Sequence, residues 1–154
     1  AAQGEVNLEA IYLSDLALAH LMVRNWNAAA DTAQRAVVLF AQLEQPLSST
    51  VAHATLAAAQ LALGQRQAAE ISARKAVSIL DACGGEGPDF PHRDYWLCAN
   101  TLAALGFSAD AQHAADWAAH LLCQRADRIS NEAMRTTYLT KVALHAEITA
   151  AVSA

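Results

Sequence analysis

The sequence predicts an all-α protein, a superhelix of three antiparallel helix pairs followed by capping helices at the C-terminal end. Alanine, the best helix former, makes up about a quarter of the 154 residues. The chain contains only 6 Gly and 3 Pro, too few for a turn-rich β-sandwich. An alanine-centred pattern also repeats along the chain, at offsets of 40 and then 42 residues.

The repeated pattern lies in the second helix of each expected pair. Residues 33–40, 73–80 and 115–122 align, and a further alanine precedes each segment. Two alanines of each unit therefore stand seven residues apart, about two helical turns, on one face of the helix. Small side chains on that face allow another helix to approach closely. The three alanine pairs are Ala29/Ala36, Ala69/Ala76 and Ala111/Ala118.

Each unit is expected to consist of an apolar helix, a turn and a second helix. The units span about residues 8–44, 48–82 and 92–125. Their first helices are the apolar stretches 8–23, 51–63 and 95–105, and turns follow at 24–25, 64–65 and 106–108. Asn25 and Ser108 are the expected N-caps of two of the second helices, because short polar side chains can accept a backbone hydrogen bond there.

Residues 83–91 form the one long loop that the sequence predicts, since they hold three of the six Gly and two of the three Pro. We expect this loop to lie within a single domain over residues 1–154, because the stretch beyond it is too short for a comfortable core of its own. A C-terminal cap over 130–152 is expected, with helices at about 131–139 and 144–152, since terminal repeats are usually atypical.

These helix pairs resemble tetratricopeptide repeats (TPR). Where that family has Leu-Gly in its first helix, this chain has Leu16-Ala17, Leu56-Ala57 and Cys98-Ala99. Where the family has Ala-x-x-x-Phe and a further Ala in its second helix, the chain has Ala29/Ala33/Ala36, Ala69/Ala73/Ala76 and Ala111/Ala115/Ala118. The resemblance implies a helical repeat that acts in protein–protein interaction or as a scaffold.

The stretch over residues 95–150 is also similar to the C-terminal end of the helical repeat region in large bacterial signalling ATPases and transcriptional regulators. The matching residues are Tyr95-Trp96, the stretches 102–106 and 126–129, Arg135 to Leu139, Val142 and 145–148. The resemblance implies a sensing or docking region of a larger cytoplasmic regulator in bacteria, whose partner includes that protein's own ATPase domain. The missing initial Met agrees with a chain taken from a longer protein.

Charge and cysteine content argue against several classes of protein. The net charge is −5 and no cluster of Lys or Arg stands out, which argues against nucleic-acid binding and against a basic membrane-surface helix. No apolar run reaches 18 residues, so no membrane span is expected. Cys83, Cys98 and Cys123 are widely spaced, and we expect free, buried thiols in a reducing compartment.

No catalytic residue, cofactor site or metal site is expected. His92-Arg93-Asp94 resembles the kinase catalytic loop, but Ala99 stands where that motif needs Asn. Gly84, Gly85 and Gly87 form no phosphate-binding motif. His113 and His120 lie about 10.5 Å apart along a helix axis, too far to share one metal ion. The sequence therefore predicts a protein that is not an enzyme.

The remaining candidate site is a groove along the first helices, which line the concave face of such a superhelix. Its predicted lining is Ile11, Leu18, Met22, Val51, Ala58, Leu61, Arg93, Trp96 and Asn100. These side chains are mostly apolar, and we expect a protein or peptide partner such as an amphipathic helix. Two alternatives stay open: the groove binds a small-molecule effector, or it is covered by an upstream repeat, the C-terminal helices or a second copy in a homodimer.

Overall fold

This computed structural model describes residues 2–153, with side chains for residues 4–152. Its secondary structure is entirely helical, with eight α-helices and one 3₁₀ helix in the described range, which confirms the all-α prediction. The helices are α1 (Ala2–Met22), α2 (Trp26–Gln42), η1 (Leu47–Ser49), α3 (Thr50–Ala62), α4 (Arg66–Cys83), α5 (Pro91–Leu105), α6 (Ser108–Asp127), α7 (Glu132–Lys141) and α8 (Ala143–Ser153).

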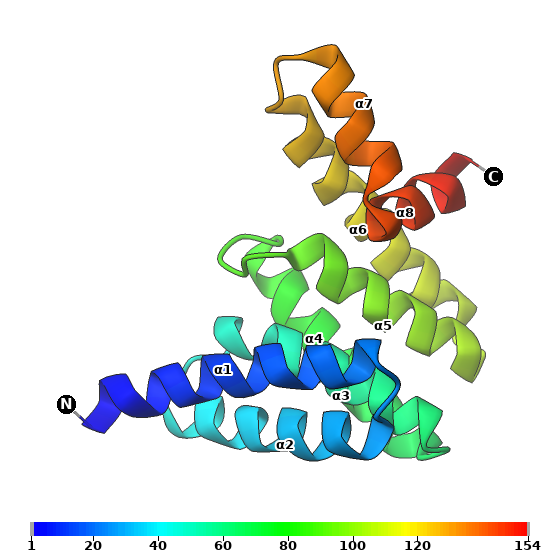
Figure 1. Cartoon of the computed structure of the whole chain (residues 1–154). Helices are drawn as coiled ribbons and strands as arrows, with labels where there is room; N and C mark the ends of the chain where they lie inside the picture. The colour runs from blue at the N-terminus through cyan, green and yellow to red at the C-terminus, as the bar shows by residue number, and fades with distance from the viewer. Residues whose placement is uncertain (1, 154) are drawn as a thin grey trace.

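The helices pack as successive pairs that rise from the N-terminal to the C-terminal end of the molecule (Figure 1). The most extensive contacts are within α1–α2, α3–α4 and α5–α6. Short connections make successive helices antiparallel neighbours. The first helices also contact one another, α1 with α3 and α3 with α5, while α2 packs on α3 and α4 on α5. Each first helix after α1 is therefore covered by the pair that precedes it.

Alanine makes this close packing possible. All six residues of the predicted alanine pairs are buried, and five of them have no exposed surface. Ala33 and Ala73, in the middle of the pattern, are also fully buried, whereas Ala115 is only half-buried. Interiors are packed as densely as organic crystals, so a larger side chain at these positions would force the helices apart.

The three turns inside the pairs share one backbone feature. Arg24, Gly64 and Gly106 occupy the same place in the repeat, and all three have positive φ, at 60°, 76° and 94°. Glycine adopts this left-handed conformation without steric cost. In Arg24 the Cβ lies too close to the following carbonyl oxygen, so the same conformation is unfavourable. The first turn is thus the strained member of the three.

The predicted helix caps are partly wrong. Asn25 is the N-cap of α2, and its side chain accepts a hydrogen bond from the Ala28 backbone N–H at 3.4 Å. The N-cap of α6 is Phe107, which makes no side-chain capping bond, and Ser108 is already the first helical residue. The capping role expected of Ser108 is therefore not fulfilled, because α6 begins one residue earlier than that role requires.

The C-terminal helices cover the end of the stack. Ile148 of α8 is fully buried in the cluster that contains Trp96, Leu121 and Leu122. The two helices run over 132–141 and 143–153, within two residues of the predicted bounds at each end. In α7, by contrast, no residue is fully buried, so this helix lies on the surface of the cap.

Candidate functional site

An apolar groove of about 740 Å³ lies between the first helices of the three pairs and α8. Five helices (α1, α2, α3, α5 and α8) and the turn at Arg24 contribute to its lining, which brings together segments from both ends of the chain. Most of its side chains are aliphatic, and three are charged. The lining residues are Leu18, Leu21, Met22, Arg24, Trp26, Ala58, Leu61, Ala62, Arg93, Leu97, Leu144 and Glu147.

Five of the nine predicted groove residues lie in this lining: Leu18, Met22, Ala58, Leu61 and Arg93. They come from α1, α3 and α5, because the repeat places equivalent faces of these three helices on the same side of the stack. The register of the repeat was therefore sufficient to find the middle of the groove.

Ile11 and Val51 lie in a smaller neighbouring pocket of about 210 Å³. This pocket is bounded by α1, α3 and the loop over residues 87–90, and Arg93 lies between it and the groove. The two residues are therefore not in the main groove but in the pocket that adjoins it at Arg93.

Trp96 and Asn100 do not line the groove. Trp96 is only 9% exposed and belongs to the core under α8, and its Nε1 donates a hydrogen bond to Glu147 Oε2 at 3.3 Å. Asn100 is exposed but lies outside the lining. The prediction that both residues line the groove is wrong. Trp96 is buried in the cluster to which α8 contributes Ile148, and Asn100 lies on another part of the surface.

Several lining residues were missed by the sequence-based prediction. Leu97 follows Arg93 by one helical turn, so the spacing of α5 could have identified it. Leu144 and Glu147 come from α8, which lies outside the repeat, and no local pattern placed that helix at the groove.

Of the three charges in the groove, Arg24 is the one without a partner among the described residues. Arg93 pairs with Asp94 Oδ1 at 3.1 Å and its guanidinium stacks on the Phe90 ring at 5.0 Å. Glu147 accepts the hydrogen bond from Trp96. The Arg24 guanidinium therefore remains available for a carboxylate on a bound partner.

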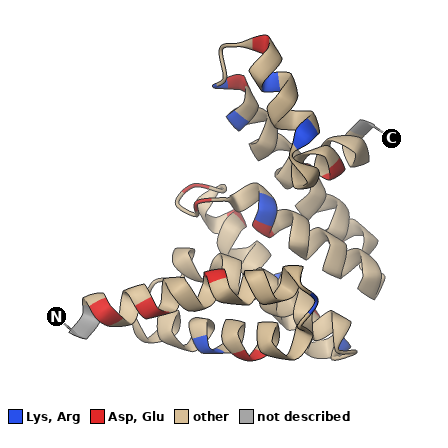
Figure 2. Cartoon of the chain, in the orientation of Figure 1, with Lys and Arg blue, Asp and Glu red and all other residues tan. Residues whose placement is uncertain are grey.

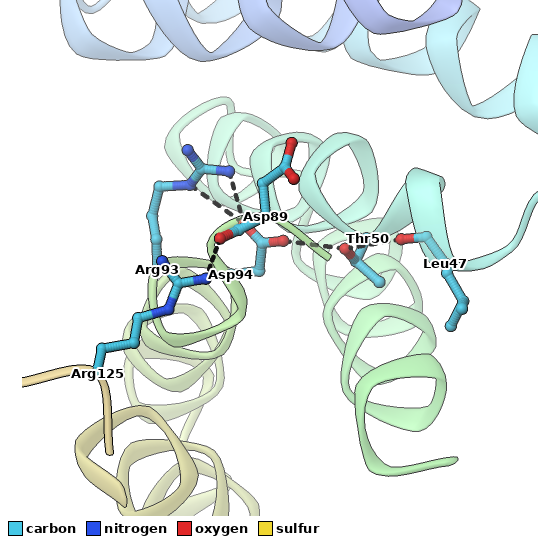
Figure 3. A network of polar contacts seen from close by, with 6 residues as sticks. All are labelled: Leu47, Thr50, Asp89, Arg93, Asp94 and Arg125. Carbon is cyan, nitrogen blue, oxygen red and sulfur yellow. Dashed lines mark hydrogen bonds and ion pairs between the residues drawn. The ribbon is translucent and has the colours of Figure 1, made fainter. Parts of the chain in front are cut away.

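Arg93 and Asp94 belong to a structural network beside the groove (Figure 3). Asp94 is almost fully buried, accepts a hydrogen bond from Thr50 Oγ1 at 2.9 Å and is held by Arg93 on its other oxygen. Burial raises the pKa of the Asp94 carboxyl to about 6, against the opposing effect of Arg93 and Thr50. Next to it, Arg125 donates a hydrogen bond to the Asp89 carbonyl and ties the long loop to α6. The network joins α3, α5 and α6.

Two histidines meet at the base of the C-terminal cap. The rings of His92 and His145 lie 5.2 Å apart, and His145 Nδ1 contacts the Tyr138 carbonyl at 2.9 Å. His92 Nδ1 is buried without a hydrogen-bond partner. Burial, reinforced by Arg125, His145 and Arg93, lowers the pKa of His92 to about 4. His92 is therefore neutral at physiological pH.

The cysteines differ in their exposure. Cys98 is fully buried, and burial raises the pKa of its thiol. Cys83 is half-buried, and Cys123 is exposed, so the prediction of three buried thiols is wrong for Cys123. Cys123 follows the buried Leu121 and Leu122, and the helical rotation turns it to the outside of α6.

In the part of the chain whose side chains are described, no three His, Cys, Asp or Glu gather closely enough to hold a metal ion. Among the helices of residues 2–153, none is long and apolar enough to cross a membrane. Near the groove, Arg93, Asp94 and Glu147 are paired within the fold. Comparison of the sequence with protein-family models, with curated proteins and with solved structures finds no match in any of the three.

Proposed function

We propose that this chain is a tetratricopeptide-like superhelix that serves as a non-catalytic protein–protein interaction module. In this proposal it is the C-terminal sensing or docking region of a larger bacterial regulatory protein in the cytoplasm. The equivalent turns at 24, 64 and 106 and the recurring packing of each pair on the next support the repeat architecture.

The observation that carries the proposal is the groove itself. Its lining is continuous over α1, α3, α5 and α8, and its aliphatic side chains include Leu18, Leu61 and Leu144. Contiguous apolar surface on a folded protein is typical of partner-binding sites. An amphipathic helix can lay its apolar face into a groove of this shape.

Arg24 suggests what the partner carries beside its apolar face. Arg24 has a left-handed backbone, whereas the equivalent position in the other two turns is glycine. For a residue with a Cβ this conformation lowers the stability of the fold by about 1 kcal/mol. Arg24 lines the groove, and its side chain has no described partner. The partner we propose is an amphipathic helix with a carboxylate at the Arg24 end of the groove.

The polar groups near the groove support a role without catalysis. Acid–base or nucleophilic chemistry needs convergent polar groups that are free to meet a substrate. Here Asp94 is occupied by Thr50 and Arg93, and Glu147 by Trp96.

The experiment is a selection of helical peptides from a displayed library on the whole chain, followed by calorimetric titration of the selected peptides. We expect selected peptides to combine an apolar face with Asp or Glu. Met22→Glu should weaken their binding by about tenfold or more, because it places a charge in an apolar contact. Arg24→Gly should weaken binding of the acidic peptides and at the same time raise the stability of the chain, since glycine relieves the backbone cost.

The matched control is Val38→Glu, which adds the same charge at an exposed position on α2 outside the groove lining. It should leave the affinity unchanged. The proposal is contradicted if the affinity of every selected peptide is the same for the wild-type chain, Met22→Glu and Arg24→Gly.

Small-molecule binding is the second candidate, and the position of α8 favours it. Leu144 and Glu147 close one end of the groove, and a volume of about 740 Å³ lies within the range of ligand pockets. A screen of small apolar molecules by thermal shift separates the two proposals. A compound that stabilises the chain and loses its effect in Leu144→Gln would favour an effector site.

A further inference from the structure

A second apolar surface lies on α1, on a different side of the helix from the groove residues Leu18 and Leu21. It consists of exposed apolar side chains at helical spacing, and we call it the α1 stripe. Its members are Leu8, Tyr12, Leu16 and Ala19 of α1 and Val23 directly after the helix, and the four large ones are 52%, 67%, 47% and 73% exposed. Such spacing keeps all five on one face over four helical turns.

The equivalent positions in the next two first helices are buried. An offset of 40 residues maps three central members of the stripe onto Ala52, Leu56 and Ala59 of α3, which are at most 4% exposed. A further offset of 42 maps these onto Asp94, Cys98 and Thr101 of α5, which are at most 1% exposed.

In both cases the cover is the second helix of the preceding pair. Ala52 packs with Ala36 and Phe40 of α2. Cys98 packs with Ala73 and Ala76 of α4. The fold thus builds the same helix-on-helix contact twice, and the α1 stripe is the corresponding face with no helix on it among the described residues.

We propose that the α1 stripe docks an amphipathic helix of the α2 and α4 kind, supplied by a partner protein. This proposal concerns a different surface from the groove and does not depend on what the groove binds. The partner helix runs antiparallel to α1, as α2 does to α3 and α4 to α5. Its docking face carries aliphatic and small residues.

Charge defines the partner further. The first half of α1 carries Glu5 and Glu9 and no basic residue, which Figure 2 shows as red segments near the start of the helix. Glu9 also forms an exposed ion pair with Arg35 of α2 at 3.5 Å. An antiparallel partner places its C-terminal half over these carboxylates, so that half should be basic. The covering helices in this chain carry basic residues near their middle, Arg35 in α2 and Arg74-Lys75 in α4. Basic residues also suit the C-terminal end of a helix dipole.

A second copy of the chain is a poorer occupant. Its α2 and α4 faces are already covered by α3 and α5, and its α6 face by α8. Two α1 stripes packed antiparallel around Tyr12 would place Glu9 of each copy opposite Asp15 of the other. Such like-charge contacts oppose association.

The test is a titration of the whole isotope-labelled chain with a synthetic peptide of the α4 sequence, residues 66–83 with Cys83→Ser, followed by NMR. We expect saturable shift changes centred on Leu8, Tyr12 and Leu16. Tyr12→Glu in the protein should weaken binding by about tenfold or more. A peptide with Arg74→Glu and Lys75→Glu should also bind more weakly, most clearly at low salt.

The matched control is Ile71→Glu in the protein, which places the same charge at another exposed apolar position. It should leave peptide binding unchanged. The proposal is overturned if the peptide causes no saturable shifts, or if the shifts fall on Leu18 and Leu21 in the groove. It is also overturned if sedimentation shows a dimer that Tyr12→Glu dissociates, because the occupant is then a second copy.

Discussion

Proton sharing between Asp94 and Thr50 governs the polar network beside the groove. Thr50 Oγ1 lies 2.9 Å from Asp94 Oδ2 and 3.2 Å from the Leu47 carbonyl, but its single proton can serve only one of them. When Asp94 is ionised, Thr50 donates to the carboxylate. When Asp94 is protonated, the acid donates to Thr50, and Thr50 donates to Leu47.

Asp94→Asn should therefore be tolerated, because an amide can reproduce the protonated arrangement. Its N–H donates to Thr50, and its oxygen still accepts from Arg93. We expect a change in the free energy of unfolding of less than about 1.5 kcal/mol, whereas Asp94→Ala should cost about 1–3 kcal/mol by leaving Arg93 unpaired in a half-buried site. Urea denaturation at pH 7 measures both values. Equal losses of unfolding free energy in Asp94→Asn and Asp94→Ala would show that the hydrogen bonds of Asp94 do not stabilise the fold.

The pH dependence of stability reflects opposing groups. The pKa of both His53 and His92 is lowered to about 4, chiefly by burial, so between pH 4 and 6.5 the unfolded chain binds more protons than the folded one. Their contribution makes stability rise with pH in that window. The pKa of Asp94 is raised to about 6, so its contribution falls as pH rises from about 4 to 6.

We predict that the free energy of unfolding of the wild-type chain rises from pH 4 to 6.5, since two histidines outweigh one aspartate. His92→Phe should flatten this rise, because it removes a buried group that must stay neutral. Asp94→Asn should make the rise steeper. Denaturation curves at several pH values provide the measurement. If the unfolding free energy depended on pH identically in all three proteins, His92 and Asp94 would not be the groups responsible.

At the scale of elements, connections of similar backbone conformation differ in what surrounds them. Gly64 between α3 and α4 has φ of 76° and open space around its Cα. Gly85, after α4, has φ of 75°, but a Cβ there would lie 2.6 Å from Leu121 Cδ1. The second position requires glycine both for its backbone and for the close approach of α6.

Gly64→Ala should lower the free energy of unfolding by about 1 kcal/mol, because a residue with a Cβ is strained in the left-handed conformation. Gly85→Ala should cost about 1–3 kcal/mol more, because Leu121 belongs to the core and must shift. Thermal or urea unfolding of the two variants measures the difference. Equal losses would mean that Leu121 moves aside freely.

Across the whole molecule, burial is distributed unevenly along the stack. The middle helices α3 and α5 are rich in buried residues, since other helices cover them on several sides. The helix α7 has none and contacts only its neighbours α6 and α8 to any extent. Local opening free energies follow such differences in packing.

Amide hydrogen exchange should therefore be slowest in α3 and α5 and fastest in α7. We expect protection in α3 to approach the value for global unfolding, whereas α7 exchanges through local opening. Exchange monitored by mass spectrometry or NMR gives the order directly. Protection in α7 as high as that in α3 would contradict the expectation that α7, which packs only on α6 and α8, opens locally.

Much of the fold could be predicted from the sequence, because helix formation and helix spacing are local properties. The alanine content predicted helices, and the positions of Ala36, Ala76 and Ala118 predicted which faces would be buried. The same register located the middle of the groove at Leu18, Ala58 and Arg93.

The sequence by itself determined the helices, their order and the faces that alanine opens to close packing. Only the tertiary structure decided that Trp96 is core and that Leu144 and Glu147 complete the groove. The contact between Trp96 and Glu147 joins residues 51 apart in the chain, outside the repeat that set the other positions. Periodicity reports on neighbours along a helix, whereas the docking of α8 depends on surface that exists only after the stack has formed.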